Sequence, residues 1–65
     1  MELTNPKHYK IGSVEAITVI EDWNLDFHLG NVIKYIARAC HKGDLIGDLK
    51  KASWYINRKI QLLEK

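Results

Sequence analysis

Residues 27–43, FHLGNVIKYIARACHKG, contain no acidic residue. At about 100° per residue, the aliphatic and small side chains of this segment gather in one wide arc, and its polar side chains lie opposite. The apolar arc contains Leu29, Val32, Ile33, Ile36, Ala37, Ala39 and Cys40, and the opposite side contains Asn31, Lys34, Tyr35, Arg38, His41 and Lys42. The pattern predicts an amphipathic helix whose polar side suits an anion with a flat ring attached, such as a nucleotide.

The chain is short. A domain of 65 residues buries only about 60% of its unfolded surface, so its own core is marginal. One cysteine cannot form an internal disulfide, and no Cys/His spacing indicates zinc, so we expect no metal and no cofactor. Because 46% of the residues are hydrophobic, we expect a single domain, residues 1–65, that gains stability as a homo-oligomer.

Charge and apolar runs bear on location and partners. No apolar run approaches the roughly 20 residues of a membrane span, and the amino terminus has no signal-peptide core. Cys40 on the apolar arc predicts a reduced, buried thiol, which fits the cytoplasm. The net charge of +2 is too small to predict nucleic-acid binding. The charge is, however, unevenly distributed along the chain: residues 1–26 carry five acids and two bases, and residues 50–59 carry four bases and no acid.

Capping and turn-forming residues predict an all-α fold of three helices, over residues 13–22, 27–42 and 48–64. An extended N-terminal arm, residues 1–12, precedes them. The arm ends in a turn at Gly12. Ser13 is the expected N-cap of the first helix and Asp26 that of the second, which Gly43 ends. Either Asp44 or Asp48 caps the third. No strand-like alternation is present.

The third helix carries two stripes. The spacing predicts that one packs in the core: Leu49, Ala52, Ile56, Ile60 and Leu63. The other alternates cations with large apolar side chains and predicts a contact surface: Lys51, Tyr55, Arg58 and Leu62, with Trp54 beside them. Arginine and aromatic residues are favoured both at protein interfaces and at base-stacking sites, and the sequence does not separate these uses.

Three phrases, PxHYxxG, GNxIKYxxR and DLxKAxWY, occur in this order between Asn5 and about Ile60. This order resembles a family of small tailed-phage proteins called SaV-like or nucleotide kinase-like. The resemblance implies a phage protein in the cytoplasm of an infected bacterium. It also implies a link to nucleotides, because one podophage relative is described as an oligomeric kinase of deoxynucleoside monophosphates without a conventional P-loop.

Lys34 and Arg38 lie one turn apart and are candidate phosphate ligands, since arginine grips phosphate bidentately and lysine supplies a point charge. The alternative is a solvated helix face. The other candidate ligand residues are Asn31, Tyr35, His8, Tyr9, Lys42 and Lys51. His8 and Tyr9 on the arm either contact a ligand or dock on a neighbouring subunit. Gly30 allows either close helix packing or close approach of a ligand.

Three functions stay open. The first is sequestration of a nucleotide or cyclic-nucleotide signal, which would counter a host defence. The second is nucleotide kinase activity, for which Glu15 or Asp22 could orient the attacking phosphate, although the chain has no GxxxxGK[ST] loop. The third is a module that binds a host protein, with Trp54, Tyr55, Arg58 and Leu62 as its interface. We favour nucleotide binding, with sequestration ahead of catalysis.

Overall fold

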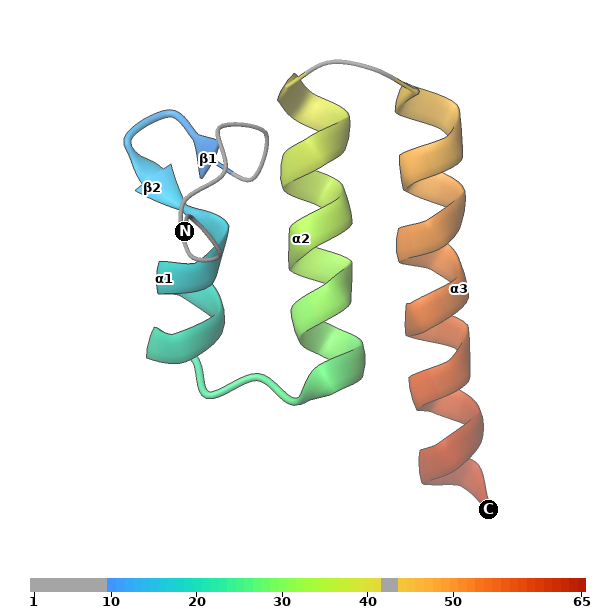
Figure 1. Ribbon diagram of the computed structural model, residues 1–65. Coiled ribbons are helices and arrows are strands. Elements are labelled where there is room, and N and C mark those ends of the chain that lie inside the picture. The colour runs from blue at the N-terminus through green and yellow to red at the C-terminus, as the bar shows by residue number, and fades with distance from the viewer. Residues whose placement is uncertain (1–9, 42–43) are drawn as a thin grey trace.

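The computed structural model describes residues 10–41 and 44–65. The described chain contains two short strands, β1 (Lys10–Ile11) and β2 (Val14–Glu15), and three helices, α1 (Ala16–Asp22), α2 (Phe27–His41) and α3 (Leu45–Glu64). Helix α2 packs between α1 and α3, so the helices form a single layer (Figure 1). The prediction of a small three-helix fold is therefore confirmed.

Residues 10–15 form an antiparallel hairpin in which Lys10 pairs with Glu15. The predicted turn at Gly12 is confirmed, and Gly12 has a φ of +61°, which glycine adopts without a steric penalty. Ser13 lies in this turn and does not cap α1, so that prediction is wrong. Glu15 occupies the N-cap position without a side-chain hydrogen bond. The hairpin escaped prediction because strands of two residues cannot show an alternating pattern.

The connection between α1 and α2 follows the prediction. Asn24 adopts a φ of +53°, beyond the end of α1. Asp26 caps α2, because its Oδ1 accepts a hydrogen bond from the backbone N–H of Leu29 at 2.9 Å. Gly30 is buried where α2 meets α1: a Cβ built there would lie 3.4 Å from Cγ2 of Ile20. Because 3.4 Å is an ordinary contact distance, packing against Ile20 does not by itself explain the glycine.

Helix α3 begins three residues earlier than expected. Asp44 is its N-cap and accepts a hydrogen bond from the backbone N–H of Gly47 at 2.9 Å, so Gly47 belongs to the first turn. Asp48, the other candidate cap, is instead buried inside the helix with 2% of its surface exposed. The predicted positions Lys42 and Gly43 lie outside the described residues, as do His8 and Tyr9.

The core of the described chain is made of small side chains: Ala16, Val32, Ala37 and Ala52. No large side chain in that part of the chain is fully buried. The prediction of a buried Cys40 is wrong, because Cys40 is exposed. Trp23, the C-cap residue of α1, is exposed as well.

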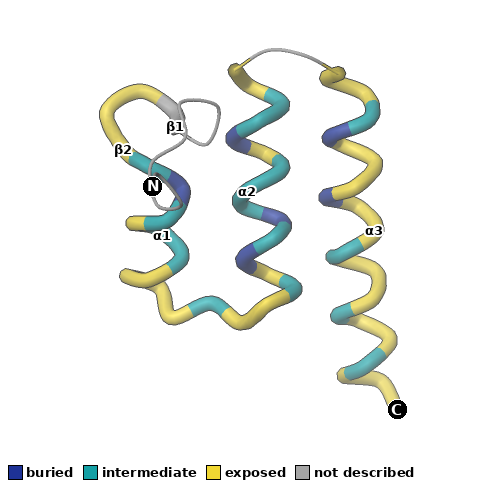
Figure 2. The backbone as a smooth tube through the Cα atoms, in the orientation of Figure 1, coloured by how far each residue is buried: buried dark blue, intermediate teal, exposed yellow. Residues whose placement is uncertain are grey.

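The predicted core stripe of α3 is also wrong. Apart from Ala52, its members are exposed: Leu49, Ile56, Ile60 and Leu63 (Figure 2). Helix α3 packs on α2 through a neighbouring stripe of buried and half-buried residues: Asp48, Ala52, Tyr55, Lys59 and Leu62. In a single layer, α3 has only one neighbouring helix, so the aliphatic flank next to this stripe stays uncovered. No helix in the described part of the chain is long and apolar enough to cross a membrane.

Candidate functional site

The layer of helices has two chemically different surfaces. Side chains from α2 and α3 meet on the first: Nζ of Lys34 and Nζ of Lys51 both lie over the Tyr35 ring, 4.8 and 5.4 Å from its centroid. Helical periodicity then assigns the remaining members of this surface. We call it the cationic face, and it comprises Phe27, Asn31, Lys34, Arg38, Lys51, Trp54 and Arg58.

The second surface carries the uncovered aliphatic side chains. Because the Lys51 flank of α3 belongs to the cationic face, the opposite flank of α3 shares a surface with the opposite side of α2. We call this surface the aliphatic face, and it comprises Leu29, Ile36, Leu45, Leu49, Ile56, Ile60 and Leu63, all exposed. Exposed Cys40 lies beside Ile36 on the same side of α2.

Aromatic rings join α2 to α3 beneath the cationic face. The rings of Tyr35 and Tyr55 are stacked, with centroids 6.0 Å apart and 14° between their planes. Phe27, His28 and Trp54 each meet Tyr55 edge to face, with centroids 6.0, 6.3 and 5.0 Å away. Tyr55 therefore packs between the helices, whereas Trp54 remains exposed.

The second stripe expected on α3 is consequently divided. Tyr55 is half-buried against α2, Leu62 is half-buried two turns further along α3, and Arg58 is exposed on the cationic face. Of the two remaining histidines, His28 packs in the aromatic cluster and His41 is exposed at the end of α2.

The ammonium groups of Lys34 and Lys51 lack acidic partners within residues 10–41 and 44–65. Each is held near the negative face of the Tyr35 ring, an attraction that leaves its formal charge unneutralised. Two like charges beside one ring repel each other. A bound anion would relieve this repulsion, so the local field favours a negatively charged ligand.

Arg38 is in a different position. Its Nε lies 3.5 Å from Oδ1 of Asp48, whose side chain is only 3% exposed. Removing that carboxylate from water is unfavourable unless a cation accompanies it, and Arg38 supplies the charge. The absence of acids within residues 27–43 concealed this pairing, because the acid comes from another helix. Arg38 therefore holds α2 to α3, in addition to its predicted place on the cationic face.

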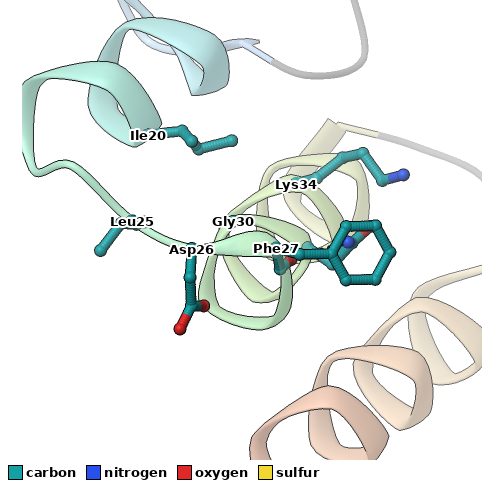
Figure 3. A pocket seen from close by; sticks show the side chains of 7 residues that line it. Ile20, Leu25, Asp26, Phe27, Gly30 and Lys34 are labelled. Atoms are coloured by element: carbon teal, nitrogen blue, oxygen red, sulfur yellow. Dashed lines mark hydrogen bonds between the residues drawn. The ribbon is translucent and has the colours of Figure 1, made fainter. Parts of the chain in front are cut away.

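An open depression of about 370 Å³ lies where the end of α1 meets the first turns of α2. Its lining residues are Ile20, Leu25, Asp26, Phe27, Gly30, Asn31 and Lys34. Ile20 reaches toward α2, and Lys34 and the ring of Phe27 extend on one side of that helix (Figure 3). Asn31 is oriented by a 2.8 Å hydrogen bond from its amide nitrogen to the carbonyl of Phe27.

Asp26 contributes the carboxylate of the depression, and its charge is already matched. A hydrogen bond from the Lys59 ammonium lowers the pKa of Asp26 below its ordinary value, and the bond from the backbone of Leu29 lowers the pKa further. Asp26 points away from Lys34 (Figure 3). Its carboxylate also accepts a hydrogen bond from the backbone N–H of Leu29 at the start of α2. An anion would therefore approach the Lys34 end of the depression and not the helix terminus.

The structure brings together several of the residues singled out in the sequence. Asn31 and Lys34 line the depression, and Lys34 also lies over the Tyr35 ring together with Lys51. Phe27 was missed as a lining residue, although it lies four and seven positions before Asn31 and Lys34 and so shares their side of α2. Glu15 and Asp22 are not among the lining residues.

A family model described as a protein of unknown function, DUF3310, matches residues 3–57. No curated protein matches the chain. No solved structure matches it either.

Proposed function

Since the chain belongs to the DUF3310 family, whose description names no activity, we propose from its geometry that it binds a nucleotide on the cationic face. The observation that carries this proposal is the convergence of Lys34 and Lys51 on the Tyr35 ring without acidic partners in the described chain. A phosphate group is the ligand that such a pair of ammonium groups favours. Arg38 lies one turn further along the same side of α2, but its charge is paired with Asp48, so the proposal is carried by Lys34 and Lys51.

The base would occupy the adjoining depression. Phe27 is 70% exposed and offers a ring face, and Ile20 and Leu25 supply apolar walls. Stacking of a base on an aromatic ring contributes about 1–3 kcal/mol. The volume of about 370 Å³ falls within the range of small-molecule sites. Lys34 lines this depression and also contacts Tyr35, so it links the phosphate and base subsites.

We propose binding without turnover, as in a phage protein that sequesters a nucleotide or cyclic-nucleotide signal and thereby counters a host defence. Sequestration requires only positive charge and a stacking surface, and both are present. A kinase must also hold Mg²⁺ and a second nucleotide. The carboxylate that lines the depression, Asp26, is bonded to Lys59 and to the backbone of Leu29. This arrangement favours sequestration over transfer.

Calorimetric titration with nucleoside monophosphates, triphosphates and cyclic dinucleotides tests the proposal, with inorganic phosphate as a reference. The expected result is saturable binding that Lys34→Ala weakens. Lys50→Ala is the matched control, because Lys50 is an exposed lysine of α3 outside the cationic face. Ligand recovered intact after denaturation supports sequestration, whereas conversion to a diphosphate identifies a kinase. If no nucleotide binds at millimolar concentration, the proposed function is wrong and a protein partner becomes the better explanation.

A further inference from the structure

The aliphatic face is the largest feature of the molecule that the proposed function leaves without a role. Its seven residues run along the whole of α3 and onto α2, and each is exposed by 36% or more. Helical periodicity places no charged side chain of α2 or α3 among them. The last turns of α3 extend beyond the first turn of α2, so part of this face has no neighbouring helix in the layer (Figure 1).

The size of this face is what a protein interface requires. A helix of 20 residues is about 30 Å long, and two adjacent helices make a strip about 20 Å wide. The strip therefore covers roughly 600 Å², at the upper end of the apolar patches that monomers expose. A stable dimer buries about 800 Å² per partner, which the strip and its rim together reach.

The core of the described chain requires additional burial. Its buried apolar side chains are three alanines and one valine, and its larger aliphatic side chains are half-buried or exposed. A scaffold of this size needs a disulfide, a metal or a partner to become stable. Cys40 is a free thiol, and the described residues contain no cluster that could hold a metal ion.

We propose that a second copy of this chain covers the aliphatic face, in a two-fold symmetric dimer whose cationic faces point outward. A face of leucine and isoleucine without charge is complementary to itself, as an isologous interface requires. Interfaces between identical subunits are also more apolar than those of transient partners. The dimer leaves both depressions open on opposite outer surfaces, so pairing and ligand binding use separate residues.

Light scattering and sedimentation at about 1–100 µM test this proposal with two matched variants of α3. Ile56→Glu places a charge in the aliphatic face, and Trp54→Glu places one at an exposed large residue of the opposite face. The wild type and Trp54→Glu should have twice the 7.6 kDa mass of one chain. For Ile56→Glu, the dissociation constant of the dimer should be at least a hundredfold higher than for the wild type. A monomeric wild type, or an assembly that Trp54→Glu breaks and Ile56→Glu does not, overturns the proposal.

Ile56→Glu could fail to fold if folding and pairing are coupled. Ile56→Ala is the milder variant and should weaken the dimer about tenfold, whereas Trp54→Ala should leave it unchanged. The urea midpoint of the wild type should also rise with protein concentration, and a midpoint constant over a hundredfold range contradicts a dimer.

A monomer that sediments with uncharged (zwitterionic) phospholipid vesicles, and that Ile56→Glu releases from them, would show that a lipid surface covers this face and would refute the second copy. Lys34→Ala should dimerise like the wild type. A failed dimer is thereby distinguished from a failed ligand site.

Discussion

Nε of Arg38 on α2 lies 3.5 Å from the buried carboxylate of Asp48 on α3. This ion pair crosses the interface between α2 and α3, where most of the helix packing occurs. It connects a residue of the cationic face to the interior. Arg38 is 42% exposed and Asp48 is 3% exposed, so the two partners are not equivalent. Removing the arginine leaves a carboxylate in a site from which water is excluded.

Arg38→Ala should lower the free energy of unfolding by about 1–3 kcal/mol, because the buried acid loses its counter-charge. Urea denaturation monitored by circular dichroism measures this loss. The double variant Arg38→Ala with Asp48→Asn should recover part of it, since the amide carries no charge. If the double variant is less stable than Arg38→Ala by the full effect of Asp48→Asn alone, the two residues are not coupled.

Lys34→Ala and Lys51→Ala should each weaken nucleotide binding about tenfold to a hundredfold, because each removes a charged partner of the phosphate. Neither lysine is paired with an acid of the described chain, so the free energy of unfolding should change by less than about 0.5 kcal/mol. Calorimetry and urea denaturation on the same samples separate the two effects. Equal affinity in both variants and the wild type would remove these lysines from the site.

Gly30→Ala should raise the free energy of unfolding by up to about 1 kcal/mol, because alanine is the better helix former. The added methyl would lie 3.4 Å from Cγ2 of Ile20, which is an ordinary contact distance. Gly12→Ala is the contrasting variant. At a φ of +61° it should cost about 1–2 kcal/mol. Thermal denaturation should show opposite shifts, and destabilisation by Gly30→Ala would mean that α1 cannot adjust to the methyl group.

The bond between Asp26 and Lys59 should make stability depend on pH. The pKa of Asp26 is lowered from 3.8 in the folded chain, chiefly by the Lys59 ammonium. The contribution is therefore fully present above the unfolded pKa and is lost as the pH falls through the folded pKa. Wild type and Lys59→Ala should differ most in urea midpoint above about pH 5 and should converge toward pH 2. A difference that persists at pH 2 would assign Lys59 a role independent of Asp26.

Local signals in the sequence predicted the helices well. Asp26 was identified as a cap because a short acidic side chain precedes an apolar periodic segment, and the structure confirms its bond to Leu29. Ser13 was assigned to a helix start, but the Gly12 turn places it in a hairpin. Such competition between a cap and a turn is decided by contacts beyond the local segment.

The packing of α3 was not predictable from its own periodicity. Both of its stripes are apolar enough to pack, and periodicity does not reveal how many neighbours a helix has. The stripe that packs on α2 lies between the two predicted ones and takes Ala52 from one and Tyr55 from the other. The pairing of Arg38 with Asp48 was missed for the same reason, since a charge pattern within one helix omits charges on the next. Lys34 and Asn31 do share one side of α2, as predicted, because their relative positions depend only on that helix.

A layer one helix thick has no deep interior to separate its two surfaces. Under the proposed function, substitutions at positions 27, 31 and 34 would alter ligand recognition, while those at positions 29 and 36 would alter the proposed dimer interface on the far side of the same α2 helix. Ligand binding and pairing would then change independently of each other, although both kinds of residue share one stretch of sequence.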